Sequence, residues 1–270
     1  MTRLIPILAY HSQNIANNEY HGNDHVAFQA DMSFLIRNEF KFLSALDLVM
    51  ALREKRLNKL APKSVVITFD DGPIYDAQDF KHPVYGYQKS MSNIMREHQT
   101  RRFIFWKKKV SATSFVIASD RAREEIGSVE NGANYLKNDF WSDKTNLLEI
   151  GVHSWDHVHP LSSEARMHAN SLERFDKIND LDYMNQQIIK ASRSIKNISG
   201  SKFSPVFAYP YGLYSDFLVN QYLPNQTEVM GAFTTDGRYC DDQTNFWAIP
   251  RFVCGHHWKS AEEFKKLMSN

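Results

Sequence analysis

The stretch Val65-Val66-Ile67-Thr68-Phe69-Asp70-Asp71-Gly72-Pro73 decides the fold. Its first five residues are all β-branched or aromatic, a pattern typical of a strand that is covered on both faces. The strand ends in two adjacent carboxylates and a Gly-Pro break, and α/β barrels place their catalytic groups at this end of a strand. Adjacent side chains on an extended chain point in different directions, so Asp70 and Asp71 can take separate roles, one as a metal ligand and one as a base. The alternative is an Asp-Gly turn with two solvated acids.

Similar apolar runs recur along the chain, between segments with helical periodicity. Predicted strands cover residues 5–9, 65–69, 113–118, 148–152, 203–209 and 229–233, and predicted helices cover residues 44–57, 182–198 and 260–268. This alternation predicts an α/β fold, either a barrel or a doubly wound sheet. No linker or internal repeat divides the 270 residues, so we expect a single domain over residues 1–270.

Residues 73–109 interrupt this pattern. The segment mixes Tyr75, Phe80, Tyr85 and other aromatic residues with polar ones, before a helical pattern begins at about Lys89. An insertion of this length after a strand either forms a lid or wall beside the site or is a plain surface excursion. The sequence leaves both interpretations open.

Composition and charge exclude several classes of protein. With 43% hydrophobic and 23% charged residues, the chain has a globular composition, which argues against a disordered or fibrous protein. The 32 Lys and Arg residues balance 31 Asp and Glu residues, so the basic excess of a nucleic-acid-binding protein is missing, and we expect no nucleic-acid partner. The one cationic cluster, residues 101–109, is interpreted as a solvated helix face or as a patch for an anionic glycan or membrane surface.

The N-terminus and the cysteines bear on location. Residues 1–11 contain only a short apolar run broken by Pro6, which is not the pattern of a secretory signal, and no run has the length of a transmembrane helix. We expect a cytoplasmic protein as the chain stands, or a periplasmic or extracellular one if a leader has been removed. Cys240 and Cys254 are too few for a disulfide framework.

A second predicted strand end is rich in histidine. It reads Gly151-Val152-His153-Ser154-Trp155-Asp156-His157-Val158-His159. His153 and His157 are four residues apart, so one helical turn or a tight loop can aim both imidazoles at one point. Two imidazoles and a carboxylate are a common zinc ligand set that leaves positions open for water and substrate. His159 is the weaker ligand candidate.

Two further strand ends, Tyr10-His11-Ser12 and Tyr209-Pro210-Tyr211-Gly212, carry aromatic and polar groups. Each by itself is an ordinary junction between a strand and a turn. Together with the carboxylates and the histidines they indicate a shared site, because the carboxyl ends of parallel strands lie on one face of a barrel. The sequence therefore predicts one site built from four strand ends.

These motifs resemble, in order, those of the NodB-homology polysaccharide deacetylases, carbohydrate esterase family four. Residues 68–72 and 153–157 match the family's Thr-Phe-Asp-Asp-Gly and His-Ser/Thr-x-x-His motifs, residues 112–116 resemble the strand between them, and residues 210–212 resemble the third motif. The resemblance covers about residues 5–252 and implies a distorted (β/α)7 barrel, of which residues 73–109 would be an insertion.

The resemblance also implies a role for each site residue. Asp70 would be the general base, and Asp71, His153 and His157 would hold a divalent metal, most often Zn²⁺, with Co²⁺, Ni²⁺ or Fe²⁺ as alternatives. The backbone N–H of Tyr211 would donate to the oxyanion. The implied activity is hydrolysis of N-acetyl or O-acetyl groups on a carbohydrate substrate.

The chain departs from the family pattern in three places. Residues 204–209 lack the arginine that usually precedes Pro-Tyr, residues 241–243 are no clear match to the fourth motif, and the C-terminal Leu-x-His is missing. A circularly permuted subgroup, similar to poly-N-acetylglucosamine deacetylases, carries its catalytic acid in an N-terminal Tyr-His segment. We therefore expect His11 to be the acid, with His256 and His257 as alternatives and a purely structural His11 as the third possibility.

Two other functions are compatible with the sequence. One is a metal-dependent hydrolase of a C–N bond in a small non-sugar molecule, which would suit an insertion that closes the groove. The other is a non-catalytic carbohydrate-binding protein on the same scaffold. The presence of Asp70, Asp71, His153 and His157 argues against the second.

Overall fold

The structure of the protein is a computed structural model that describes residues 3–100, 110–128 and 134–269. Across these residues, eight parallel strands form one sheet. Its order is β10-β1-β3-β6-β7-β8-β9, and the short β2 pairs with the start of β3. The strands are β1 (Ile7–Tyr10), β2 (Lys41–Leu43), β3 (Ser64–Phe69), β6 (Ala112–Val116), β7 (Leu148–Val152), β8 (Phe203–Ala208), β9 (Gly231–Phe233) and β10 (Phe252–Val253). The cationic cluster at residues 101–109 lies outside the described residues.

The last strand segment closes the sheet. Ile249 forms a parallel bridge with Phe233 of β9, and three residues later Phe252 pairs with Leu8 of β1. Residues 249–253 therefore run from one edge of the sheet to the other. The result is a distorted (β/α)7 barrel in a single domain, which confirms the predicted fold class and decides against the doubly wound sheet.

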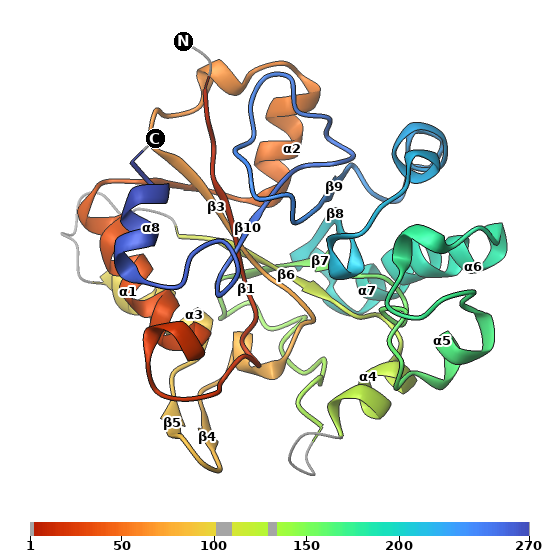
Figure 1. Cartoon of the computed structure of the whole chain (residues 1–270), viewed down its shortest axis with the longest axis horizontal. Coiled ribbons are helices and arrows are strands. Elements are labelled where there is room, and N and C mark those ends of the chain that lie inside the picture. Colours follow the sequence, from red (N-terminus) through yellow and green to blue (C-terminus); the bar gives the residue numbers. More distant parts are fainter. Residues whose placement is uncertain (1–2, 101–109, 129–133, 270) are drawn as a thin grey trace.

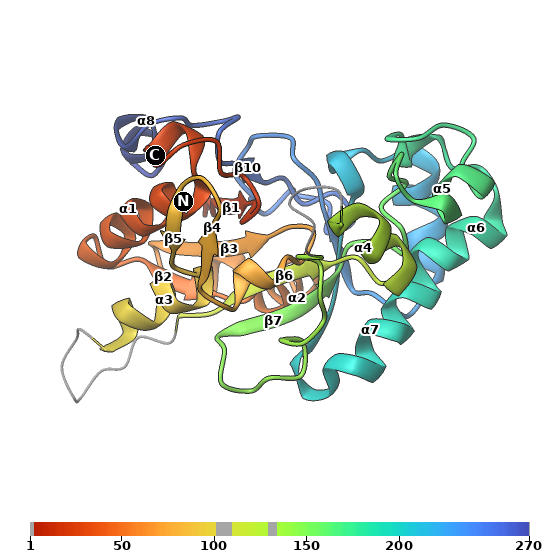
Figure 2. The same ribbon diagram turned by 90° about the horizontal axis from the view of Figure 1, so that it is seen from below.

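Helices α1, α3 and α8 lie on one side of the barrel and α4 to α7 on the other (Figures 1 and 2), whereas α2 packs on β3 and β8. Their bounds are α1 (Asp24–Arg37), α2 (Ala45–Arg53), α3 (Met91–Thr100), α4 (Asp120–Gly127), α5 (Ser163–His168), α6 (Leu181–Asn185), α7 (Ala191–Ser199) and α8 (Ala261–Leu267). Ser44 and Ser260 cap α2 and α8 by accepting backbone N–H groups three residues ahead, which is why both helices begin where the sequence predicted. The helix predicted over residues 44–57 ends at Arg53, because the chain turns at Lys55, whose φ is 52°.

Alternate residues of each strand belong to two different hydrophobic clusters. Val65, Ile67 and Phe69 of β3 pack in the larger cluster, whereas Val66 packs in a second one together with α2. This period of two separates the inward from the outward face of a barrel strand. The same alternation in β1, β7 and β8 sets which polar residues at the strand ends point into the barrel.

The insertion at residues 73–109 contains a two-stranded hairpin of β4 (Phe80–His82) and β5 (Gly86–Gln88), followed by α3. The hairpin projects from the end of the molecule that lies away from both termini (Figure 1). It is tied to the loop after β1, since the Asn18 amide donates to the carbonyl of Tyr85 at 3.1 Å and the Asn23 amide donates to Gln88 at 3.0 Å.

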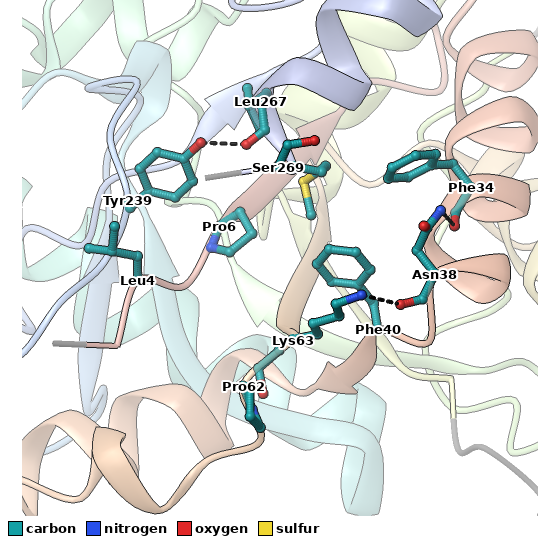
Figure 3. Close-up of a pocket in the computed structure, with 12 residues that line it drawn as sticks. Leu4, Pro6, Phe34, Asn38, Phe40, Pro62, Lys63, Tyr239, Leu267 and Ser269 are labelled. Carbon is teal, nitrogen blue, oxygen red and sulfur yellow. Dashed lines mark hydrogen bonds between the residues drawn. The ribbon is translucent and has the colours of Figure 1, made fainter. Parts of the chain in front are cut away.

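A pocket of about 310 Å³ lies at the amino ends of the barrel strands β1 and β3 (Figure 3). It is lined by residues that precede β1 and β3, among them Leu4, Pro6 and Lys63, and by Tyr239 and Leu267 near the C-terminus. No helix of the described residues is long and apolar enough to cross a membrane. Cys240 and Cys254 are both buried and free.

Asp31 of α1 links the outer layer to the barrel. Its buried carboxylate accepts hydrogen bonds from Tyr10 of β1 at 2.9 Å, from Tyr20 at 2.5 Å and from the indole of Trp258 at 3.2 Å. Burial raises the pKa of Asp31 to about 7, although the three donors act in the opposite direction. A carboxyl group whose pKa is raised by folding stabilises the folded state when it is protonated.

We expect Asp31→Asn to change how stability depends on pH. In the wild type, the contribution of Asp31 is complete below its unfolded pKa of 3.8 and is lost as the pH rises through about 7. The free energy of unfolding, measured in urea between pH 4 and pH 8, should therefore decline more steeply across this range in the wild type than in Asp31→Asn. Equal dependence of the unfolding free energy on pH in the two proteins would contradict the raised pKa of Asp31.

Candidate active site and metal centre

The strand register brings three polar residues to the inner face of the barrel. Asp70 follows β3 in the same alternation as Val66 and Thr68, which point inward. His153 follows β7 and His11 follows β1 with the same inward alternation. The predicted gathering of strand ends on one face is therefore present in the structure.

A left-handed turn separates the two adjacent carboxylates. Asp71 has a φ of 70° and Gly72 a φ of 71°, whereas Asp70 completes the run of β3. A Cβ on Gly72 would come within 2.5 Å of Cγ1 of Val116, so only glycine fits at this position. The turn directs Asp71 to the loop after β7, while Asp70 stays inside the barrel.

Asp71, His153 and His157 form a compact cluster of possible metal ligands. Oδ1 of Asp71 lies 3.4 Å from Nε2 of His153 and 3.3 Å from Nε2 of His157, and the two Nε2 atoms are 3.2 Å apart. His153 and His157 are brought together by a tight loop and not by a helical turn, because Ser154 and His157 have φ values of 68° and 62°.

The geometry of this cluster fits a tetrahedral ion. Bonds of about 2.0–2.1 Å in a tetrahedron place two ligand atoms about 3.3 Å apart, which is the spacing found between all three pairs. Nδ1 of His153 donates to the carbonyl of Ala208 at 2.8 Å, so its Nε2 carries the lone pair that a metal needs. Asp71 is ionised, since its histidine partners outweigh burial and hold the pKa of its carboxyl below the usual range. Burial lowers the pKa of His157 to about 3, which leaves this imidazole neutral.

Asp70 has a different partner. Both of its oxygens accept hydrogen bonds from the guanidinium of Arg251, each at 2.7 Å, and both side chains are buried. Burial opposes ionisation of Asp70, but the charge of Arg251 prevails and keeps its pKa below the usual range. Arg251 also donates to Thr68 and to the carbonyl of Thr234. Asp70 is thus an ionised carboxylate that stands outside the cluster of possible ligands.

No sequence motif pointed to Arg251. Residues 204–209, before Pro210, hold no arginine, whereas Arg251 comes from the segment that closes the barrel, between Ile249 and Phe252. A signal was present in Ile249-Pro250-Arg251-Phe252-Val253, because one charged residue within an apolar run marks a buried functional or structural position.

His11 lies within the same electrostatic environment. It contributes to lowering the pKa of both Asp70 and Asp71, and its Nδ1 is buried with no hydrogen-bond partner among the described residues. The loop around it is held firmly, because the backbone N–H of His11 donates to Asp24 at 2.7 Å and the hydroxyl of Ser12 donates to Asp76 at 2.6 Å.

The alternative acid candidates are placed differently. Nδ1 of His257 accepts the backbone N–H of Val253 at 2.8 Å, and its ring packs against the ring of His256. The groups that act most strongly on the pKa of Asp70 and Asp71 include His11 but neither of these two histidines. His159, the weaker ligand candidate, lies outside the cluster, and its Nδ1 accepts the backbone N–H of Leu161 at 3.1 Å.

Tyr211, in the turn that follows β8, lies beside the ligand cluster. Its backbone has a φ of 59°, and its ring lies edge-on to the imidazole of His157 with 4.5 Å between the ring centroids. All four strand ends that the sequence singled out therefore converge, and Arg251 adds a fifth group.

The family is shown by comparison with known proteins. A polysaccharide deacetylase family model matches residues 58–226, which is more than half of the chain, so the protein belongs to the polysaccharide deacetylase family. No curated protein sequence matches the chain.

Several solved structures share the fold at low sequence identity. A Streptococcus pyogenes deacetylase, PplD, determined in complex with acetate, is 17% identical with a TM-score of 0.68, and the match covers 100% of both chains. IcaB from Ammonifex degensii is 16% identical with a TM-score of 0.62 over 99% of this chain and 96% of that one. A de-N-acetylase from Aggregatibacter actinomycetemcomitans is 15% identical with a TM-score of 0.59 over 97% and 99%.

Removal of Arg251 should destabilise the protein strongly. Arg251→Met leaves the Asp70 carboxylate buried without its partner, and breaking a buried ion pair in this way costs about 3–5 kcal/mol of unfolding free energy. Urea unfolding of Arg251→Met, of Asp70→Asn and of the double variant measures the effect, and the double variant should lose less than the sum of the two single ones.

The matched control is Arg56→Met, which removes an arginine paired with Glu54 at the surface. Exposed pairs of this kind contribute only about 0–1 kcal/mol. A loss in Arg251→Met no larger than the loss in Arg56→Met would contradict a stabilising role for the buried pair.

Proposed function

We propose that this protein is a divalent-metal-dependent deacetylase that hydrolyses N-acetyl, or O-acetyl, groups on a carbohydrate. The observation that carries the proposal is the Asp71–His153–His157 cluster beside Asp70, a second carboxylate that is ionised and not part of the cluster. Family membership supports a carbohydrate substrate, and the structures that share the fold include one in complex with acetate and one described as a de-N-acetylase.

The cluster would hold Zn²⁺, or Co²⁺, Ni²⁺ or Fe²⁺. Such an ion, when bound, would polarise the acetyl carbonyl group and lower the pKa of the attacking water. Asp70 takes a proton from the attacking water, which its ionised state allows. Arg251 fixes both oxygens of Asp70, so the base keeps one orientation during the reaction.

Two further groups complete the proposed mechanism. The backbone N–H of Tyr211 donates to the developing oxyanion, an interaction that is typically worth about 3 kcal/mol in the transition state. His11 gives a proton to the departing amine as the C–N bond breaks, and histidine is the side chain that most often performs such proton transfers. The position of His11 near Asp70 and Asp71 supports it over His256 and His257 as the acid.

Acetate release tests the proposed reaction. We expect the metal-loaded protein to release acetate from N-acetylhexosamine oligomers and to lose this activity in the presence of a chelator. Activity that survives the chelator would refute metal dependence. Release from no acetylated sugar, combined with hydrolysis of small non-sugar amides, would replace the carbohydrate substrate by a small-molecule one.

The two carboxylates should be separable by substitution. We expect Asp70→Asn to keep its metal and to lose about 10²–10⁴-fold in kcat, because the base is removed while all three ligands of the cluster are kept. Asp71→Asn should bind Zn²⁺ more weakly, measured by competition with a chromophoric chelator. Near-full activity of Asp70→Asn would show that the base has been assigned wrongly.

A further inference from the structure

Gln13 is a polar side chain of the site to which the proposed mechanism gives no role. It lies two residues after His11, on the loop that follows β1, and its Nε2 donates a hydrogen bond to Oδ2 of Asp71. The histidines face the other oxygen of Asp71, Oδ1. Gln13 therefore approaches the ligand cluster from the side of His11.

The charge of Asp71 fixes the orientation of the Gln13 amide. An amide oxygen against a carboxylate oxygen would be repulsive, so the NH₂ group must face Asp71 and the carbonyl oxygen must face the other way. That oxygen, Oε1, is buried and accepts no hydrogen bond from any described residue. A buried amide oxygen without a donor is unfavourable by the full cost of its desolvation, so this position calls for a donor from outside the chain.

The reacting group of the substrate carries such a donor. In the proposed mechanism His11 protonates the leaving atom of the acetyl group, so this atom must lie near the loop that carries both His11 and Gln13. For an N-acetyl group the leaving atom is a nitrogen that bears one hydrogen. For an O-acetyl group it is an ester oxygen that bears none.

We propose that Oε1 of Gln13 accepts the N–H of the substrate acetamido group and thereby makes the enzyme selective for N-acetyl over O-acetyl groups. This inference rests on the proposed function and deepens it. A site built to accept a substrate N–H discriminates against the analogue that lacks the hydrogen, because the acceptor is then left unpaired in a buried position. Gln13 has a second effect through its Nε2, which orients Asp71 as a ligand.

The test compares two matched substrates. Oligomers of 2-acetamido-2-deoxyglucose and glucose oligomers with a 2-O-acetyl group differ at the reacting centre by NH against O. We expect Gln13→Met, assayed at saturating Zn²⁺, to lose about tenfold or more in kcat/KM for the N-acetyl oligomer and less than about threefold for the O-acetyl oligomer. The ratio of the two values does not depend on how much of the variant is folded.

Asn14→Ala is the matched control. Asn14 is the next residue of the same loop and its side chain is exposed, so its ratio should equal that of the wild type. A readout independent of activity is the affinity for Zn²⁺, which should fall by roughly 10–100-fold in Gln13→Met, because the donor to Asp71 is lost.

The outcomes separate this inference from the function on which it rests. A wild-type protein that releases acetate from neither oligomer refutes the proposed function and the inference with it. An active wild type in which Gln13→Met slows both substrates equally, or neither, overturns the role of Gln13 and leaves the deacetylase function standing. Equal slowing is also the result expected if a water molecule, and not the substrate, occupies the acceptor.

Discussion

The buried ion pair between Asp70 and Arg251 is the interaction on which the rest of the site depends. It joins the end of β3 to the segment that closes the barrel. The same contact therefore holds the barrel closed and orients the proposed base. Removing two charges from water costs several kcal/mol each, and the pair is tolerable because both carboxylate oxygens and all three guanidinium nitrogens form hydrogen bonds. The same pairing keeps the pKa of Asp70 below its usual range in a position where burial alone would raise it.

The ligand cluster depends on backbone strain that the barrel sustains. Asp71, Ser154, His157 and Tyr211 all have a positive φ, although none of them is glycine. Each such residue costs on the order of 1–3 kcal/mol and persists only where the surrounding structure holds it. Here the loops follow directly after parallel strands of the barrel, which hold the loop ends in place. Two imidazoles and one carboxylate therefore lie at the spacing of a metal site.

The order of the strands explains how the two ends of the chain serve one site. Because β10 lies beside β1, Arg251 near the C-terminus and His11 near the N-terminus approach the same carboxylate from neighbouring strands. The loop after β1 is held by Asp24 and Asp76 and carries Gln13 as well as His11. One well-anchored loop thus supplies both the proposed acid and the proposed acceptor for the substrate N–H, which ties specificity to the same segment as catalysis.

The sequence by itself predicted the fold class and the family, and it singled out Asp70, Asp71, His153 and His157, with His11 as the expected acid. These residues sit within apolar strands or directly after them, where a local pattern of period two and a short motif are enough to place them at a strand end. Tyr211 was also placed by its motif, although by itself it looked like an ordinary turn.

Only the tertiary structure decided the partner of Asp70, the shape of the loop between His153 and His157, and the place of Gln13. Each of these depends on contacts between segments far apart in the chain: Arg251 meets a carboxylate 181 positions earlier, and Gln13 meets one 58 positions later. A local pattern carries no information about such a meeting, because the closure of the barrel and the register of its strands bring the two groups together. The sequence therefore named the residues of the possible ligand cluster and the proposed base, and the barrel determined which other side chains lie beside them.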